Sequence, residues 1–346
     1  MSISNTASGN TSTQSENENR LQIEHLLNAA TESASALTEK SDVIAGLTQK
    51  PKSIQARYFY DDYGSQLFEQ ICDLPEYYLT RTETAILQEY AKSIAQLTGA
   101  CELVELGSGS STKTRILLDA YNQLGYPLRY TSIDVSAGIL ELSAKELLTD
   151  YPSLQVQALV STYELALKQL KSSQLPNRVI CFIGSSLGNL KAQECKTFFT
   201  QITKALKPGE YFLLGIDLHK SKHLLEAAYN DSQGVTAAFN LNMLKHLNQR
   251  FDGNFDLTQF EHLAFYNETQ HQIEMHLRSL RSQNVTLSAL DLTIELAANE
   301  TILTEISRKF DLNNIQQELQ AQGLKPIHTW TDANKHFGVL LCRLLN

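Results

Sequence analysis

At 346 residues, the chain is long enough to bury one large hydrophobic core or two smaller ones. Its 42% hydrophobic and 19% charged residues are ordinary for a globular protein, and no run approaches the roughly 18 apolar residues of a membrane span. The net charge of −9 argues against nucleic acid as a partner, because phosphate binding needs a positive face. The five scattered cysteines include no Cys-x-x-Cys pair, so neither a disulfide framework nor a metal site is implied. We expect a cytoplasmic protein without a signal peptide or a membrane partner.

The first hundred residues predict helices after a polar tail. Residues 1–19 have almost no large apolar side chain, which indicates a disordered tail. Apolar residues at helical spacing predict helices over 21–37 and 41–49. After an aromatic-rich stretch, we expect Ser65 to cap a helix over 66–72 and Thr82 to cap one over 83–97.

From Cys101 onward, strands and helices alternate. The apolar runs predict strands over 103–106, 130–135, 154–159, 179–183 and 211–216. Between them lie helical patterns over 112–124, 137–148, 162–170 and 191–206. Strands that are apolar on both faces and separated by helices indicate a parallel sheet covered on both sides.

This rhythm stops after Asp217. Residues 219–251 have a mostly helical pattern, and 262–306 alternate with period two, which predicts an antiparallel meander. A helix over 312–322 and an apolar strand over 338–345 complete the chain. We therefore expect an α/β fold in which a Rossmann-like domain (82–219 and 309–346) carries a discontinuous α+β accessory domain (20–81 and 220–308).

The stretch from Cys101 to Arg115 has the strand, tight turn and helix start that present backbone N–H groups to a nucleotide-like ligand. Gly107 and Gly109 permit positive φ angles and a close approach of the backbone. Asp134 ends the next strand, where its carboxylate can accept hydrogen bonds from a ribose, although a helix-capping role is also open. NAD and S-adenosylmethionine both fit this pattern. Serines in place of a third glycine favour the methyltransferase variant.

The remaining motifs resemble one family closely, the L-histidine Nα-methyltransferases of ergothioneine biosynthesis. The resemblance spans roughly residues 55–345. It is carried by Phe59-Tyr60-Asp61, Leu74-Pro75-Glu76-Tyr77-Tyr78-Leu79-Thr80-Arg81-Thr82-Glu83, Glu105-Leu106-Gly107-Ser108-Gly109, Gly184-Ser185-Ser186-Leu187-Gly188-Asn189, Gly215-Ile216-Asp217, Tyr229-Asn230-Asp231 and Leu303-Thr304-Glu305-Ile306-Ser307-Arg308-Lys309. The resemblance implies a class I methyltransferase domain and the trimethylation of histidine to hercynine.

By this resemblance, Gly107, Lys113 and Asp134 hold S-adenosylmethionine, and Lys113 faces its carboxylate. The family usually has Asp-Phe after the third strand, to bind and stack on the adenine. This chain has Thr162-Tyr163 there. The Tyr163 ring can still stack, but a hydroxyl is a poorer acceptor than a carboxylate. We therefore expect a weaker adenine contact.

The resemblance also implies a histidine site shared by the two domains. Asn189 and Tyr229 would hold the substrate carboxylate, and Tyr60 and Tyr77, the proposed catalytic residues, would line the amino group and the imidazole. The other substrate-binding positions are Gly184, Met275, Glu305 and Ser307. Because Glu305 and Ser307 are two residues apart on one strand, they share a face and suit the two imidazole nitrogens.

Two other functions remain open from the sequence. The chain could methylate another amino acid, such as a tryptophan derivative, although an indole offers no acceptor to pair with Ser307. It could also be a regulatory protein that binds the cofactor without catalysis, and Thr162 is the feature in favour of that. For the enzyme, we expect a small-molecule substrate and a monomer.

Overall fold

The computed structural model describes residues 20–26 and 29–345, so the predicted tail at 1–19 lies outside the described residues. Its larger sheet has the strand order β1-β5-β4-β3-β6-β7-β14-β13. The strands from β1 to β7 in this order are parallel, whereas β14 is antiparallel to both of its neighbours. Their bounds are Leu21–His25 (β1), Cys101–Leu106 (β3), Arg129–Asp134 (β4), Gln155–Val160 (β5), Asn177–Phe182 (β6), Tyr211–Asp217 (β7), Leu324–Thr331 (β13) and Phe337–Leu344 (β14).

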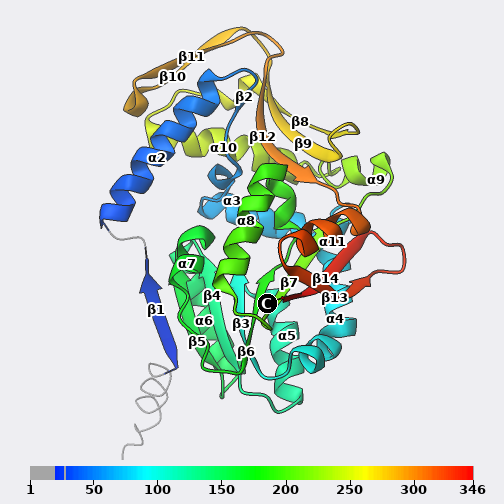
Figure 1. Ribbon diagram of the computed structural model, residues 1–346. Helices are drawn as coiled ribbons and strands as arrows, with labels where there is room; N and C mark the ends of the chain where they lie inside the picture. Colours follow the sequence, from blue (N-terminus) through cyan, green and yellow to red (C-terminus); the bar gives the residue numbers. More distant parts are fainter. Residues whose placement is uncertain (1–19, 27–28, 346) are drawn as a thin grey trace, which may run out of the picture.

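Helices cover both faces of this sheet, as the apolar strands predict (Figure 1). One core joins the sheet to α4, α5 and α6, and the other joins it to α7, α8 and α11. The helices are Tyr78–Thr98 (α4), Thr112–Gln123 (α5), Ala137–Asp150 (α6), Tyr163–Gln169 (α7), Ala192–Ala205 (α8) and Leu312–Ala321 (α11). This is the Rossmann-like architecture that the sequence predicts, with strand β3 at the point where the strand order reverses.

A second layer lies above the carboxyl ends of the parallel strands (Figure 1). It contains a sheet of order β2-β12-β9-β8, the hairpin β10-β11, and four helices. Its own core joins residues from 43–79 to residues from 225–302. The elements are Ala29–Thr48 (α2), Lys52–Ser53 (β2), Asp62–Asp73 (α3), Lys222–Ala227 (α9), Val235–Phe251 (α10), Phe260–Asn267 (β8), Gln272–Ser279 (β9), Gln283–Leu287 (β10), Leu292–Leu296 (β11) and Thr301–Arg308 (β12).

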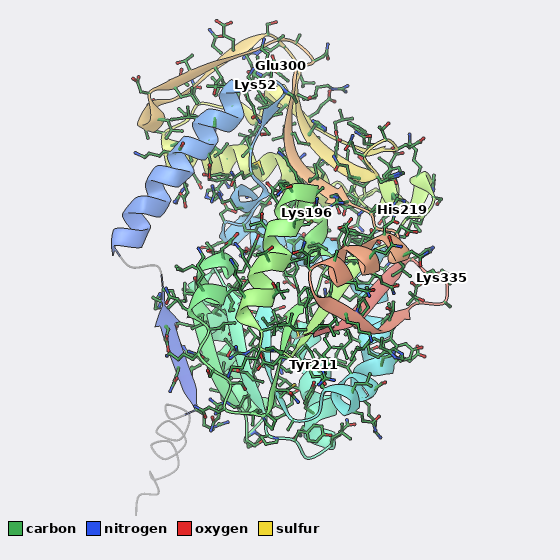
Figure 2. The ribbon with its side chains drawn as sticks, in the orientation of Figure 1. Lys52, Lys196, Tyr211, His219, Glu300 and Lys335 are labelled. Carbon is green, nitrogen blue, oxygen red and sulfur yellow. The ribbon has the colours of Figure 1, made fainter. Side chains whose placement is uncertain are left out.

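Contacts between distant segments hold this layer together. Lys52 on β2 forms an ion pair with Glu300, just before β12, at 2.5 Å, and the two side chains lie together in Figure 2. Lys52 follows helix α2 and Glu300 follows strand β11, and both segments pack into the same core. The ion pair therefore joins the N-terminal part of this layer to the part formed by residues 220–308. No helix in the described part of the chain is long and apolar enough to cross a bilayer.

Several predicted elements are wrong at the N-terminal end. Residues 21–25 form strand β1 rather than a helix, and this strand pairs with β5 at the edge of the larger sheet. It therefore lies with the sheet and not with the accessory domain to which we assigned it. A short apolar run fits either periodicity, and here the free edge of β5 decides the outcome.

Two helices begin earlier than predicted. Helix α3 starts at Asp62, and its cap is Asp61, whose carboxylate accepts the Gly64 N–H at 2.7 Å; Ser65 has no such role. Helix α4 starts at Tyr78, so Thr82 lies inside it and donates to the Tyr78 carbonyl at 2.8 Å. The meander is also interrupted, because β9 pairs with β12 and the β10-β11 hairpin projects separately. Strand β13 was not predicted.

Candidate active site

The carboxyl edge of the larger sheet and the second layer meet at a short turn, Ser186–Asn189, called η2. Gly188 is the contact point. A Cβ added there would lie 3.0 Å from the Arg308 carbonyl oxygen and 3.5 Å from the Ser307 Oγ. Only glycine allows the turn to approach strand β12 this closely. The site therefore lies where parallel strands end and the second layer begins, as is general for open α/β sheets.

The glycine turn after β3 has room for a ligand. Gly107 and Gly109 have φ angles of +69° and +48°, and a Cβ at either would meet no atom within 4 Å. Within the described residues, the buried Ser108 Oγ has no hydrogen-bond partner. The Asp134 carboxylate accepts the Gly109 N–H at 3.1 Å and the Ser136 N–H at 3.0 Å, so Asp134 and not Ser136 supports this corner. An open turn, an unpartnered hydroxyl and a carboxylate fit the cofactor expected here.

Lys113 lies in the first turn of α5 and is held by an acid that the sequence did not single out. Its ammonium group forms an ion pair with Glu83 at 2.5 Å, and Glu83 is fully buried on α4. The Glu83 carboxylate also accepts the Gly184 N–H at 2.8 Å. Gly184 has a φ angle of +85°, and a Cβ there would lie 3.4 Å from the Lys113 ammonium. Glu83 thus fixes both Lys113 and Gly184 while leaving other ammonium hydrogens of Lys113 for a ligand.

The residues expected to contact adenine have structural partners. Thr162 is the N-cap of α7 and accepts the Leu165 N–H at 3.4 Å. The Tyr163 ring packs edge-on against Phe198 with a centroid distance of 5.6 Å. Nearby, the buried Ser161 Oγ has no partner within the described part of the chain. The adenine roles of Thr162 and Tyr163 stay predictions.

An aromatic wall leads from the surface into the second layer. Neighbouring ring centroids are 5.8 Å apart for Tyr60 and Phe68, 6.5 Å for Phe68 and Tyr77, and 6.2 Å for Tyr77 and Tyr229. Tyr60 is 45% exposed, whereas Tyr77 and Tyr229 are buried. Burial of the hydroxyl group raises the pKa of all three phenols, including that of Tyr60, although that residue as a whole is partly exposed. The Glu305 carboxylate adds to this effect and Lys309 opposes it at Tyr229, and all three phenols stay protonated at neutral pH.

A β-bulge determines which way Glu305 and Ser307 face. Strand β12 pairs Leu303 with His276 but Glu305 with Met275, so Thr304 is an extra residue without a partner position. The bulge moves Glu305 and Ser307 to the face that carries the buried Met275 and Ile273. A regular strand would have placed Glu305 on the opposite face. Two of the predicted residues thus share the inner face with Met275.

The Glu305 carboxylate is isolated in this environment. Within the described residues it accepts no hydrogen bond, and burial raises its pKa to about 7, although nearby Lys309 opposes the shift. An acid with this pKa can be charged or neutral close to physiological pH. A partner that donates a hydrogen bond would stabilise the charged form.

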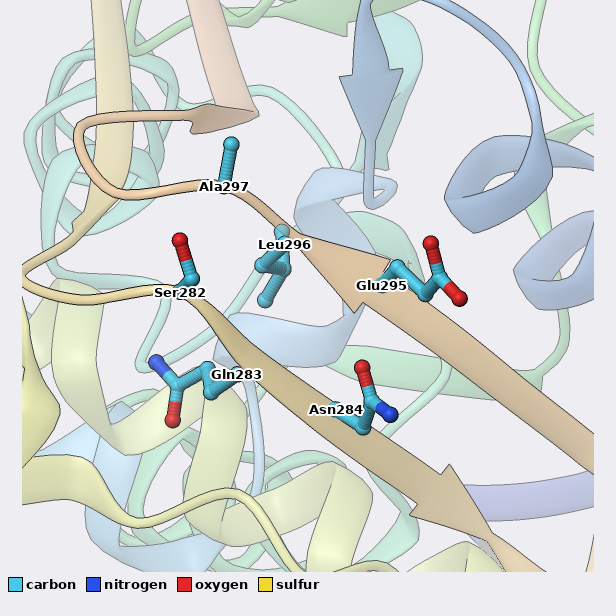
Figure 3. Close-up of a pocket in the computed structure, with 6 residues that line it drawn as sticks. All are labelled: Ser282, Gln283, Asn284, Glu295, Leu296 and Ala297. Carbon is cyan, nitrogen blue, oxygen red and sulfur yellow. The ribbon is translucent and has the colours of Figure 1, made fainter.

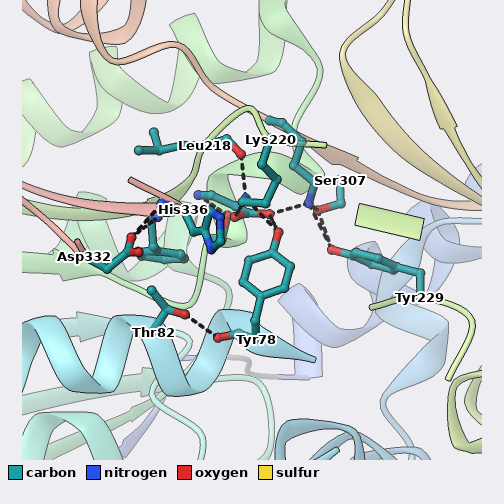
Figure 4. Close-up of polar contacts among 12 residues, drawn as sticks. Tyr78, Thr82, Leu218, Lys220, Tyr229, Ser307, Asp332 and His336 are labelled. Atoms are coloured by element: carbon teal, nitrogen blue, oxygen red, sulfur yellow. Dashed lines mark hydrogen bonds and ion pairs between the residues drawn. The ribbon is translucent and has the colours of Figure 1, made fainter. Parts of the chain in front are cut away.

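A buried charge cluster around Asp217, at the end of β7, reaches Ser307 through Lys309. Figure 4 shows Tyr78, Lys220, Tyr229 and Ser307 gathered around these contacts. Asp217 accepts hydrogen bonds from Tyr78 at 2.7 Å and Lys220 at 2.5 Å, and it forms an ion pair with Lys309 at 2.9 Å. Burial alone would raise its pKa, but the two ammonium groups lower it. Burial lowers the pKa of Lys220 to about 8, whereas the Asp217 carboxylate raises that of Lys309 despite its burial. Asp217 and Lys309 therefore remain a charged pair.

The structure brings Tyr77, Tyr229 and Ser307 together through ring and hydrogen-bond contacts. Tyr229 donates to the Ser307 Oγ at 2.8 Å, so its hydroxyl hydrogen already has an acceptor. Asn189 ends the η2 turn beside β12; it is half-buried, and within the described residues no hydrogen bond engages its side chain. The expected carboxylate contacts of Asn189 and Tyr229 stay predictions.

Four residues that build the site had no role in the sequence interpretation. They are Phe68 in the aromatic wall, Glu83 beneath Lys113, and the pair Asp217 and Lys309. All except Phe68 belong to recognisable motifs, but an acid or lysine within a motif does not reveal its partner. A separate shallow hollow of about 520 Å³ lies on the β10-β11 hairpin (Figure 3) and shares no residue with this site.

The Rossmann-like sheet, the open glycine turn and the lysine and acid beside it fit an S-adenosylmethionine-dependent methyltransferase. The family model described as "Histidine-specific methyltransferase, SAM-dependent" matches residues 39–344, and the chain belongs to that family.

Named relatives share most of the chain. The histidine N-alpha-methyltransferase of Mycolicibacterium smegmatis is 43% identical over 313 residues, which cover 90% of this chain and 96% of that protein. The Mycobacterium tuberculosis protein of the same name is 40% identical over 310 residues, with the same coverage. Ergothioneine biosynthesis protein 1 of Neurospora crassa is 28% identical over 303 residues, which cover 83% of this chain and 32% of that protein.

Proposed function

We propose that this methyltransferase transfers three methyl groups to the α-amino nitrogen of L-histidine and so forms hercynine, the first step of ergothioneine biosynthesis. The names of the relatives support this substrate. The observation that carries the proposal is the pair formed by Glu305 and Ser307 on the inner face of β12. A carboxylate beside a hydroxyl matches the donor and acceptor nitrogens of a neutral imidazole.

Gly107, Lys113 and Asp134 are the residues that we propose to hold S-adenosylmethionine, with Thr162 and Tyr163 at its adenine. When bound, this cofactor supplies a methyl group that is already activated by its sulfonium charge. The task of the protein is therefore alignment and exclusion of water rather than strong acid–base catalysis. Glu83 supports that task by fixing the Lys113 ammonium beside Gly184.

The aromatic wall is proposed to surround the reacting nitrogen. Because the phenols of Tyr60 and Tyr77 have raised pKa values, they remain neutral and can accept a hydrogen bond from the substrate ammonium without ionising. Their oxygens would then guide the departing proton to water. The ring faces favour the positive charge that grows with each added methyl group.

We also propose that the second layer is the substrate-binding domain of a cytoplasmic monomer. The sequence assigns it to 20–81 and 220–308, but it begins only at α2, because β1 belongs to the larger sheet. The separate core of this layer supports the division. All five cysteines are free thiols, which suits a reducing compartment. Sedimentation of the purified protein at micromolar concentration would test the monomer.

The activity is tested by incubating the purified protein with L-histidine and S-adenosylmethionine and by following products with mass spectrometry. We expect mono-, di- and trimethylated histidine in sequence, with fragment ions that place all three methyl groups on the α-nitrogen. L-Tryptophan serves as the competing substrate. No α-trimethylated histidine at saturating cofactor, or a faster reaction with tryptophan, would contradict the proposal.

A further inference from the structure

Lys309 is a buried cation to which the reaction described above assigns no role. It follows strand β12, and its side chain is fully buried. Its ammonium group reaches the Asp217 carboxylate at 2.9 Å, the Ser307 Oγ at 2.9 Å and the Tyr229 Oη at 3.2 Å. Two of its hydrogens are thus donated to hydroxyl oxygens, while the Asp217 carboxylate balances its charge. Lys309 thus contacts two hydroxyl groups, those of Ser307 and Tyr229, on the side of β12 where the substrate is proposed to bind.

These contacts limit what each of the two hydroxyl oxygens can do. Lys309 has no acceptor, so both oxygens must accept from it. Tyr229 in turn donates its own hydrogen to Ser307 at 2.8 Å, as Figure 4 shows. Within the described part of the chain, the Ser307 Oγ therefore accepts two hydrogen bonds and donates none. Its single hydrogen is the one that the group can offer to a ligand.

The Glu305 carboxylate provides the opposite function on the same face. It lies two residues before Ser307, beyond the same bulge, and no donor within the described residues engages it. An unpaired acceptor next to an uncommitted donor is complementary to a ring with one N–H and one bare nitrogen. A hydroxyl without Lys309 beside it could rotate and serve as either donor or acceptor, so Ser307 alone would not distinguish such a ring.

We propose that Lys309 is a positioning residue that fixes the Ser307 hydroxyl as a donor, so that the site selects a ring carrying an acceptor nitrogen beside its N–H. This inference rests on the proposed function, because histidine is the amino acid that offers such a ring. The competing arrangement reverses the hydroxyl pair. Ser307 would then donate to Tyr229, and Tyr229 would donate to the substrate carboxylate.

The test compares binding of L-histidine with that of the two pyrrolylalanines, in which one or the other ring nitrogen is replaced by C–H. These analogues keep an N–H but lack the acceptor. In calorimetry with S-adenosylhomocysteine present, we expect the wild-type protein to prefer histidine by about tenfold or more, the effect of leaving a buried donor unpaired. Lys309→Met should reduce the ratio of the pyrrolylalanine and histidine dissociation constants to within about twofold of unity.

Lys220→Met is the matched control, because Lys220 also contacts Asp217 but does not contact Tyr229 or Ser307. It removes the same charge from the same cluster and should keep the wild-type ratio. Ser307→Ala, which adds no buried charge imbalance, should lose the ratio as Lys309→Met does. A retained ratio in Ser307→Ala would contradict the inference even if Lys309→Met fails to fold.

Three results would overturn the inference. They are a wild-type ratio in Ser307→Ala or in folded Lys309→Met, an equal loss in Lys220→Met, and a wild-type protein that binds pyrrolylalanine as well as histidine. L-Histidinol, which lacks the carboxylate, tests the competing arrangement. If Tyr229 donates to the substrate carboxylate, Lys309→Met would lose the preference for histidine over histidinol instead of the preference for histidine over pyrrolylalanine. Failure of the proposed function is distinguishable, because the wild-type protein would then neither bind nor methylate histidine.

Discussion

Glu305 lies directly opposite Met275 on the antiparallel strands β9 and β12, one position beyond the bulge at Thr304. The hydrogen of the Thr304 hydroxyl is shared between the Asn240 Oδ1 at 2.8 Å and the Met275 carbonyl at 3.0 Å, which holds the bulge in place. A carboxylate with a pKa raised to about 7 therefore faces a flexible, fully buried apolar side chain. The proposed substrate site thus has, at one point, a carboxylate that needs a hydrogen-bond donor and a methionine side chain that can adapt its shape.

Glu305→Ala should weaken histidine binding by about 1.5–3 kcal/mol, because a charge-assisted hydrogen bond is lost. Cofactor binding should stay nearly unchanged. Discrimination against tryptophan should also relax, since an apolar ring would no longer leave a carboxylate unpaired. Calorimetric titration of both amino acids measures these effects. The exposed Glu295→Ala is the control, and equal histidine affinity in Glu305→Ala and wild type would place Glu305 outside the site.

Glu305→Gln should make the ligand-free protein more stable at pH 8, by about 1–3 kcal/mol. Burial raises the pKa of Glu305 from 4.5 to about 7, so the folded state binds more protons than the unfolded state between these values. The free energy of unfolding contributed by Glu305 therefore falls as pH rises from about 4.5 through 7. Denaturant unfolding should show the advantage of the variant at pH 8 and its loss at pH 5. A constant difference at both values would contradict the raised pKa.

The sequence predicted the central sheet well, because strands such as 103–106 and 211–216 are apolar on both faces and flanked by helical patterns. It could not predict β1, whose five residues become a strand only by pairing with β5. The motifs identified Glu305, Ser307 and Lys113, but not the partners that hold them. Glu83 and Lys113 are 30 residues apart, and Lys309 and Asp217 come from different elements, so only the fold brings each pair together.

Asp134→Ala should weaken S-adenosylhomocysteine binding by about 1–3 kcal/mol, because a ligand hydroxyl would lose its acceptor and the Gly109 N–H would lose its partner. Calorimetry without histidine measures this effect. Glu141→Ala, at a partly exposed position of α6 where, within the described residues, its carboxylate contacts only Lys145, should change nothing. An unchanged dissociation constant in Asp134→Ala would mean that the cofactor lies elsewhere.

Glu83→Gln should also weaken S-adenosylhomocysteine binding, by roughly 5- to 50-fold, because Lys113 would lose the charge that positions it. The amide could still accept the Gly184 N–H, so the turn should keep its shape. Glu89→Gln, on the exposed side of the same helix, is the matched control. If Glu83→Gln bound the cofactor normally, the ion pair would have a purely structural role. The variant would then have a lower free energy of unfolding than the wild-type protein.

Gly188→Ala should selectively impair the substrate side of the site. The added Cβ would lie 3.0 Å from the Arg308 carbonyl oxygen and 3.2 Å from the Arg308 nitrogen, so either η2 or β12 must move by a few tenths of an ångström. Both are backbone atoms of the strand that carries Glu305 and Ser307. A shift of that strand would disturb the hydrogen bonds to the ring while leaving the glycine turn at Gly107 untouched.

We therefore expect the Michaelis constant for histidine to rise by roughly tenfold or more in Gly188→Ala, with a nearly constant dissociation constant for S-adenosylhomocysteine. Gly138→Ala is the control, because Gly138 lies in helix α6 and an added Cβ would meet no atom within 4 Å. That change should keep both constants and stabilise the protein by about 0.5–1 kcal/mol. A normal Michaelis constant in Gly188→Ala would show that the contact between η2 and β12 does not control how histidine is bound.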